Sequence, residues 1–167
     1  MYEVGSLILY GRNGVCRVEE IKENEVSGQR QLFYVLKPLY QNCNITIAVD
    51  NTKVFFRPII SRDEAHSLID KMPEIRAEPY HNRNLTQLRE YYKNWLDSHE
   101  CIRIVEMTKS LYAKRCEAER EKRKFGAVDE RFLKEAEELL FGELAAALEI
   151  EKSEVLDYIA SRIGTTA

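Results

Sequence analysis

The stretch YEVGSLILYGRNGVCRVEEI, residues 2–21, decides how the rest of the chain is read. Two runs rich in aliphatic and β-branched residues flank the four residues Gly11-Arg12-Asn13-Gly14. Asn-Gly between two such runs is typical of a β-hairpin, because both residues tolerate a positive φ and the resulting turn matches the twist of paired strands. The stretch therefore predicts two antiparallel strands, residues 7–10 and 15–21, joined by a tight turn.

The β pattern continues to about residue 58. Residues 22–30 are polar, and Ser27-Gly28 within them marks a turn. Further strands are expected over residues 31–37, 44–49 and 53–57. Five short strands without an intervening helix predict a small antiparallel barrel of the SH3 or Tudor type. Its open edges either pair with another chain or are covered by the rest of the molecule, and the sequence leaves both alternatives open.

The second half of the chain is predicted to be helical. Ser61-Arg62-Asp63-Glu64 is a capping-box pattern that begins a short helix. Gly126 suits the left-handed residue that follows a helix, and residues 164–167 are expected to fray. Apolar residues spaced by three and four predict the remaining helices. These cover about 84–98, 100–124, 129–148 and 154–163.

The expected fold class is α+β, with two segregated domains. A Tudor-like β domain covers residues 1–58, a short helix and linker cover 59–82, and an all-α domain covers 83–164. Trp95, the only tryptophan, lies on the apolar stripe of its helix. We expect it to be a core anchor rather than a ligand contact.

Charge is segregated along this chain of 167 residues, whose net charge is −3. Residues 109–124 carry a net charge of +4, and residues 128–157 carry −7. No apolar run approaches the roughly 20 residues of a membrane span, and no signal peptide is seen at the N-terminus. The four cysteines are widely spaced, which favours reduced thiols in the cytoplasm and no metal site.

No set of residues in the sequence indicates an enzymatic function. The sequence lacks a glycine-rich phosphate loop, a nucleophile elbow and a metal-binding helix motif. Its three histidines are scattered, and Glu135, Glu138 and Glu143 are interpreted as a solvated helix face. We therefore expect no catalytic residue, no cofactor, no membrane contact and no small-molecule ligand.

The basic end of the long helix is the best candidate for a chemical role. Cations there can contact phosphates, which adds affinity without reading base sequence. The alternative is a solvated helix whose charges pair with one another at helical spacing. The candidate cations are Lys114, Arg115, Arg120, Lys122, Arg123 and Lys124.

Several motifs in order resemble the CarD/CdnL family of bacterial transcription regulators. They are Val4-Gly5-Ser6-Leu7-Ile8-Leu9-Tyr10-Gly11-Arg12-Asn13-Gly14-Val15-Cys16, Tyr34-Val35-Leu36-Lys37, Val49-Asp50-Asn51, Arg57-Pro58-Ile59-Ile60-Ser61 and the helix around Gly142-Glu143-Leu144-Ala145. The resemblance is to the subgroup found in clostridia and their relatives. It implies a Tudor-like domain that binds the RNA polymerase β subunit by edge-strand pairing. It also implies a helical domain that contacts DNA at the upstream edge of the promoter bubble.

The resemblance also places candidate contact residues on this sequence. Two arginines that contact polymerase in some members fall on Asn24 and Ala48, the apolar residue between them falls on Val26, and a DNA-wedging tryptophan falls on Leu85. The expected polymerase contacts are Asn24, Val26, Thr46, Ala48 and Val49. Leu85 and Arg89 join the basic residues as expected DNA contacts. The predicted function is a regulator that binds polymerase and promoter DNA, with a protein-binding adaptor that makes no DNA contact as the alternative.

Overall fold

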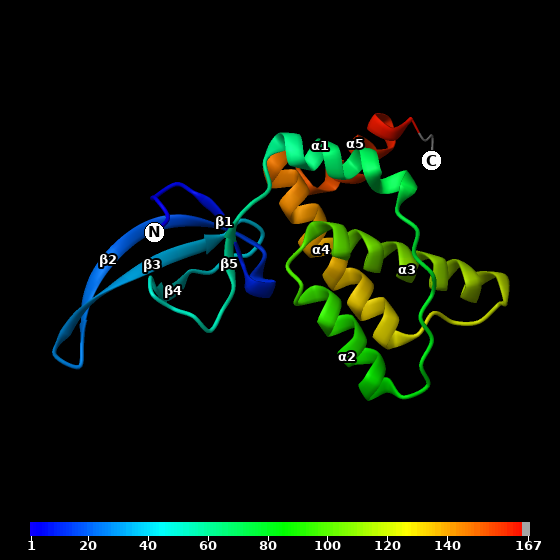
Figure 1. Cartoon of the computed structure of the whole chain (residues 1–167), viewed down its shortest axis with the longest axis horizontal. Coiled ribbons are helices and arrows are strands. Elements are labelled where there is room, and N and C mark those ends of the chain that lie inside the picture. Colours follow the sequence, from blue (N-terminus) through cyan, green and yellow to red (C-terminus); the bar gives the residue numbers. More distant parts are fainter. Residues whose placement is uncertain (165–167) are drawn as a thin grey trace. The chain divides into compact units, whose positions relative to one another are not determined.

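The computed structural model describes residues 1–164, and it divides the chain into two compact units (Figure 1). They are Met1–Ile60 and Ser61–Ala167. Within the described residues, the first unit holds five β-strands and the second holds five α-helices. This confirms the predicted α+β class. The predicted fraying of residues 165–167 lies outside the described residues.

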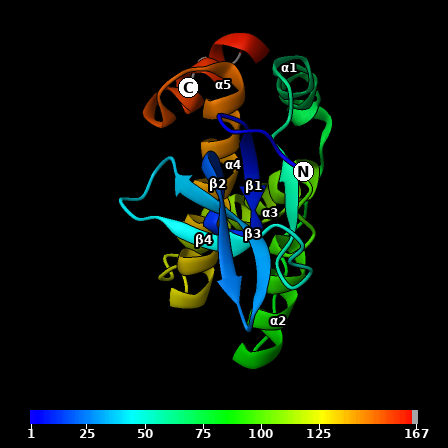
Figure 2. The same cartoon turned by 90° about the vertical axis from the view of Figure 1, so that its left-hand side faces the viewer.

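The first unit is one antiparallel sheet with the strand order β4-β3-β2-β1-β5, and Figure 2 labels the first four strands of the chain, β1 to β4. Its strands are β1 (Leu7–Tyr10), β2 (Val15–Val26), β3 (Gln29–Pro38), β4 (Ile45–Ala48) and β5 (Phe56–Pro58). The terminal strands β4 and β5 each pair with one neighbour and not with each other. The sheet is therefore open: the predicted Tudor-like domain is present, but its barrel does not close.

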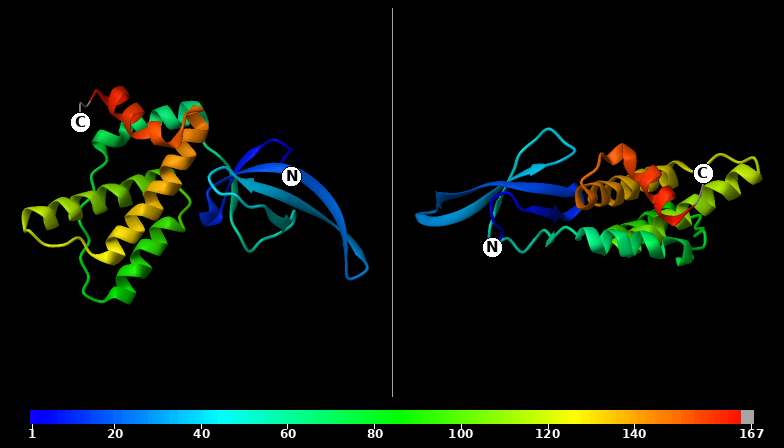
Figure 3. Two further views of the ribbon diagram at one scale, coloured as in Figure 1. Left: turned by 180° about the vertical axis from the view of Figure 1, so that it is seen from behind. Right: turned by 90° about the horizontal axis from the view of Figure 1, so that it is seen from above.

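Strands β2 and β3 are longer than the sequence predicts and form a hairpin that extends beyond the other strands (Figures 1 and 3). Val26 pairs with Gln29, so the turn consists only of Ser27 and Gly28, with φ of 53° and 80°. Two consecutive positive φ values are those of a type I′ turn. The polar stretch expected to be a loop is therefore mostly strand, because cross-strand pairing outweighs its low apolar content.

The first turn differs from the predicted Asn-Gly hairpin. Gly11–Asn13 form a 3₁₀ turn, and the positive φ values belong to Gly11 and Gly14 rather than to Asn13. Gly11 has φ +48°, and a Cβ built on it would lie 3.0 Å from Val54 Cγ1. Glycine is needed there both for its backbone conformation and for this close approach.

One face of the sheet carries the core of the first unit. Its buried residues are Ile8, Tyr10, Cys16, Val18, Tyr34 and Leu36. Ile45, Ile47, Val49 and Phe56 are partly buried against this cluster. Because side chains alternate along each strand, the other face of β2, β3 and β4 is left outside the core.

The second unit packs five helices. They are α1 (Arg62–Lys71), α2 (Leu85–Leu96), α3 (Cys101–Arg120), α4 (Ala127–Leu148) and α5 (Val155–Ile163). Helices α2, α3 and α4 contact one another, and α1 and α5 lie together (Figures 1 and 3). The predicted capping box at Ser61 and Glu64 is confirmed, with both reciprocal hydrogen bonds present.

Helix α3 ends four residues before its predicted end. Lys122 has φ +55°, its N–H donates to the Glu119 carbonyl, and the Arg123 N–H donates to the Ala118 carbonyl. This is a Schellman motif with Lys122 as the left-handed residue. The prediction that Gly126 has this role is wrong, because Gly126 has φ −63° and is the N-cap of α4.

The prediction that Glu143 lies on a solvated face is also wrong. Glu143 is only 2% exposed, and its Oε1 accepts a hydrogen bond from the Cys101 thiol at 3.1 Å. The helical periodicity did not predict the burial of Glu143. A buried carboxylate needs a polar partner, and the sequence does not show that Cys101 is close to it.

Candidate functional site

Four of the five predicted polymerase contacts lie on one face of the sheet. Lys22 and Ala48 both pair with Phe33, while Thr46 pairs with Val35. Asn24 pairs with Gln31 and Val26 with Gln29, two and four positions along β3 from Phe33. Since residues an even number apart share a face, Asn24, Val26, Thr46 and Ala48 all lie opposite the core.

Val49 lies on the other face. It packs against the core cluster, and its N–H donates to the Leu32 carbonyl at 3.0 Å. The structure thus separates Val49 from the other four predicted contacts. It also adds Phe33 and Val35, both half-buried, to the outer face. Sequence reasoning missed these two because a nearly continuous apolar run does not say which side chains face the core.

The outer edge of β4 carries unpaired backbone groups. The Val49–Leu32 hydrogen bond sets the alternation of the ladder, so Ile45 and Ile47 direct their backbone groups toward β3. Thr46 and Ala48 direct theirs toward the open edge. The Ala48 carbonyl accepts from the Asn51 N–H at 3.0 Å, which leaves the two N–H groups and the Thr46 carbonyl as the edge that another strand could join.

Two of the seven cations in residues 109–124 make hydrogen bonds or an ion pair within the helical unit. The Lys109 ammonium donates to the carbonyls of Met72, at 2.6 Å, and of Ile75. The Lys114 ammonium lies 3.0 Å from Asp129 Oδ1, and these side chains are only 12% and 7% exposed. Lys114, a predicted DNA contact, is therefore turned into the helix junction.

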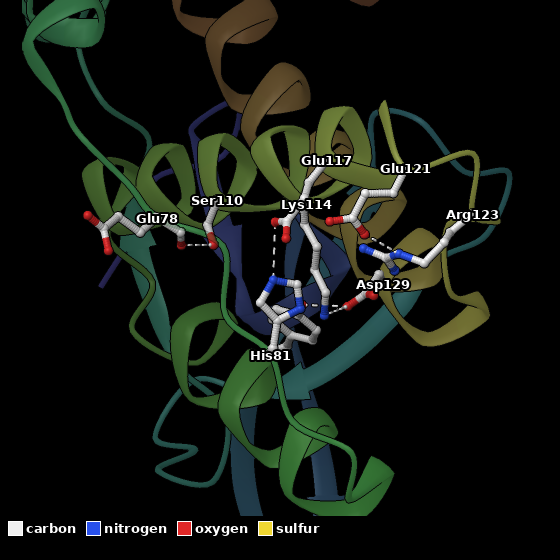
Figure 4. A network of polar contacts seen from close by, with 9 residues as sticks. Glu78, His81, Ser110, Lys114, Glu117, Glu121, Arg123 and Asp129 are labelled. Atoms are coloured by element: carbon white, nitrogen blue, oxygen red, sulfur yellow. Dashed lines mark hydrogen bonds and ion pairs between the residues drawn. The ribbon is translucent and has the colours of Figure 1, made fainter. Parts of the chain in front are cut away.

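A buried polar cluster forms around Asp129 (Figure 4). The Tyr92 hydroxyl donates to Asp129 Oδ1 at 2.6 Å, so the carboxylate receives one group from α2 and one from α3. Burial and the hydrogen bond to Asp129 raise the pKa of Tyr92 well above its ordinary value. A buried charge held by an ion pair and a hydrogen bond is satisfied, whereas removing one partner leaves the other unpaired.

The segment before α2 is bound along α3 (Figure 4). The Ser110 hydroxyl donates to the Glu78 carbonyl at 2.7 Å, and His81 Nε2 lies 3.2 Å from Glu117 Oε2. The part of the predicted linker that follows α1 is therefore ordered, and we call residues 75–84 the strap. It leads into α2, whose first residue is Leu85.

Fewer of the predicted DNA contacts are exposed than the sequence predicts. Leu85 is 51% exposed and Arg89 is half-buried on α2. Arg115 is exposed, with its guanidinium 5.1 Å from the Tyr112 ring centroid. Arg123 pairs with Glu121 and remains half exposed. We call Arg120, Lys122, Arg123 and Lys124, all exposed, the basic end of α3.

Within residues 1–164, no group of three or more His, Cys, Asp or Glu side chains is arranged to hold a metal ion. In the same part of the chain, no helix is long and apolar enough to cross a membrane.

A comparison with protein-family models matches residues 2–60 to the CarD-like/TRCF RID domain. The match covers the sheet unit described above, and it agrees with the resemblance read from the sequence. Domains of this family interact with RNA polymerase in transcription-related proteins. This match shows that residues 2–60 form an N-terminal domain of the CarD-like/TRCF RID family.

Proposed function

We propose that this chain is a non-enzymatic transcription regulator that acts in the cytoplasm at the nucleoid. Its N-terminal domain binds the β subunit of RNA polymerase, and its helical domain approaches promoter DNA at the edge of the bubble. A protein that holds both at once stabilises the open complex without recognising an operator sequence. The family of residues 2–60 supports the polymerase partner.

The observation that carries the polymerase contact is the unpaired outer edge of β4. A strand of the polymerase subunit that adds to this edge gains main-chain hydrogen bonds from Thr46 and Ala48. Its side chains meet Thr46 and Ala48 on one face and Ile45 and Ile47 on the other. No charged side chain lies on β4 itself, so affinity rests on backbone bonds and apolar contact.

The DNA contact is proposed from the basic end of α3. Its four exposed cations would lie near backbone phosphates and displace counterions. Leu85 offers an apolar side chain that fits a wedge between base steps, although it has no ring to stack on a base. We leave Lys114 out of the proposed DNA-facing residues because Asp129 already pairs with it.

A second candidate function is a polymerase-binding adaptor without DNA contact. The inward positions of Lys109 and Lys114 favour it, since they remove two cations from the surface that DNA would meet. The two functions share the β4 edge and differ only in the helical domain.

The polymerase contact is tested by Thr46→Pro in the full-length chain. Proline removes the outward N–H and is tolerated on an edge strand, so the domain stays folded while strand addition is blocked. We expect the affinity for the polymerase β subunit to fall at least about tenfold. The reason is that one or two backbone hydrogen bonds are lost and the proline ring hinders the incoming strand. Thr46→Val is the matched control, because it keeps the N–H and the β-branched shape. Wild-type binding by a folded Thr46→Pro variant would refute the edge mechanism.

A further inference from the structure

A small cavity in the helical unit is lined by three aromatic residues and two glutamates. Its volume is about 140 Å³, and Tyr91, Tyr92 and Trp95 of α2 line it. The strap contributes Arg76 and Glu78, and α3 contributes Glu106. This volume greatly exceeds the roughly 10–15 Å³ that one water molecule requires. The cavity therefore admits a small organic group.

The aromatic walls meet at steep angles. The Tyr91 ring is inclined by 65° both to Tyr92, at 5.7 Å, and to Trp95, at 6.1 Å between centroids. Tyr80 stacks on Tyr91 at 3.7 Å and fixes its orientation. Rings set nearly perpendicular to one another form the corner of an aromatic cage, which presents electron-rich faces to a cation.

This cluster already attracts one cation. The Arg103 guanidinium lies 5.3 Å from the centroid of the Trp95 ring. That distance is within the range of a cation–π interaction. Trp95 is therefore not only the core anchor that the sequence predicts, because the residue is half-buried and its ring makes a cation–π contact with Arg103.

Two glutamates are among the lining residues, the exposed Glu78 and the half-buried Glu106. Glu106 is half-buried, and the structure shows no hydrogen bond or ion pair for its carboxylate within residues 1–164. The Glu78 carboxylate is likewise unpaired in that range, since only its backbone carbonyl accepts from Ser110. Arg76 is the one cation that lines the cavity. An unpaired, half-buried carboxylate beside three rings favours a cationic ligand and disfavours a phosphate.

We propose that this cavity binds an alkylammonium group, with the aromatic corner around its methyl or methylene groups and Glu106 as its counter-charge. The group belongs either to a free quaternary amine or to a lysine side chain of a partner protein, both of which carry a positively charged nitrogen on alkyl groups. The site is separate from the β4 edge and from the basic end of α3, and it does not depend on the proposed function.

Trp95 provides the measurement, because it is the only tryptophan in the chain and lines the cavity. The full-length protein is titrated with tetramethylammonium and choline for the first source, and with n-butylammonium for the lysine source. We expect a saturable change of Trp95 fluorescence with at least one of these cations. The tighter of the two kinds of probe identifies the source.

The neutral probe 3,3-dimethyl-1-butanol has the shape of choline without its charge. We expect it to bind at least about tenfold more weakly, because the rings and carboxylates act on charge. Equal binding of the neutral probe, or no saturable change with any ammonium, would overturn the proposal.

Two variants that remove a charge are expected to change the affinity for ammonium in opposite directions. Glu106→Gln keeps the shape of the side chain and should weaken ammonium binding about three- to tenfold, as expected for a partly exposed ion pair. Arg76→Ala removes the competing cation and should tighten binding about twofold. Circular dichroism establishes that each variant is folded. Unchanged affinity in folded Glu106→Gln would refute the role of the carboxylate.

Discussion

The two units of this chain direct their polar groups in opposite ways. In the sheet unit, Thr46 and Ala48 turn backbone N–H groups outward at the edge of β4, beside the half-buried Phe33 and Val35. In the helical unit, several strong polar groups turn inward. Lys109 caps carbonyls at the end of α1, and Lys114 pairs with Asp129.

This difference shows why counting charges misjudges an interaction surface. The sheet unit has an open edge whose free polar groups are main-chain atoms, and no residue type in the sequence indicates such groups. The helical unit has seven cations over residues 109–124, yet two of them hold its helices together. The following experiments test this contrast.

The largest effect is expected from Asp129→Asn, which would break the inward polar cluster. The Lys114 ammonium would stay buried without its counter-charge, at a cost of about 3–5 kcal/mol in the free energy of unfolding. Urea denaturation followed by circular dichroism at 222 nm measures it. Glu135→Gln is the control, because its exposed pair with Arg131 contributes less than about 1 kcal/mol. Equal stability of the two variants would show that the cluster is dispensable.

A second experiment asks whether the exposed cations at the basic end of α3 bind DNA. Replacing Arg120, Lys122, Arg123 and Lys124 together by alanine should weaken duplex DNA binding about tenfold or more and reduce its salt slope by up to about 3.6. Fluorescence anisotropy at several salt concentrations measures both. The control exchanges lysine and arginine at the same four positions, which keeps the charge. An unchanged slope in the alanine variant would favour the adaptor without DNA contact.

Cys16 makes the stability of the sheet unit depend on alkaline pH. Burial, with a smaller effect of Cys43, raises the pKa of the Cys16 thiol from 9.0 to about 11. The unfolded chain releases this proton near pH 9 while the folded chain keeps it, so the free energy of unfolding falls as the pH rises from 9 to 11. Cys16→Val, which has no titrating group, should show a shallower fall in urea denaturation across this range. Parallel curves for the two proteins would contradict this assignment.

The smallest effect is expected where α3 ends. Lys122 holds a left-handed conformation that costs a residue with a Cβ about 1 kcal/mol. Lys122→Gly should therefore raise the free energy of unfolding by about 0.5–1 kcal/mol. Glu121→Gly is the control, since Glu121 has φ −87° and gains nothing from glycine. A loss of stability in Lys122→Gly would mean that the lysine side chain contributes a contact of its own.

The sequence alone determined the kind and order of the elements. Local signals were sufficient for this, as the Ser61–Glu64 capping box and the apolar stripes of α2 to α5 show. The motifs from Val4 to Ile60 also identified the family of the N-terminal domain. These features depend on residues close together in the chain, so they can be read without knowing what packs against them.

Only the tertiary structure decided which side chains meet. The register of β2, β3 and β4 places Asn24, Val26, Thr46 and Ala48 on one face and sends Val49 to the other. Partners distant in sequence turned Lys114 and Glu143 inward. Pairing and burial depend on the balance between desolvation and a specific partner, and that partner is supplied by a different helix or strand.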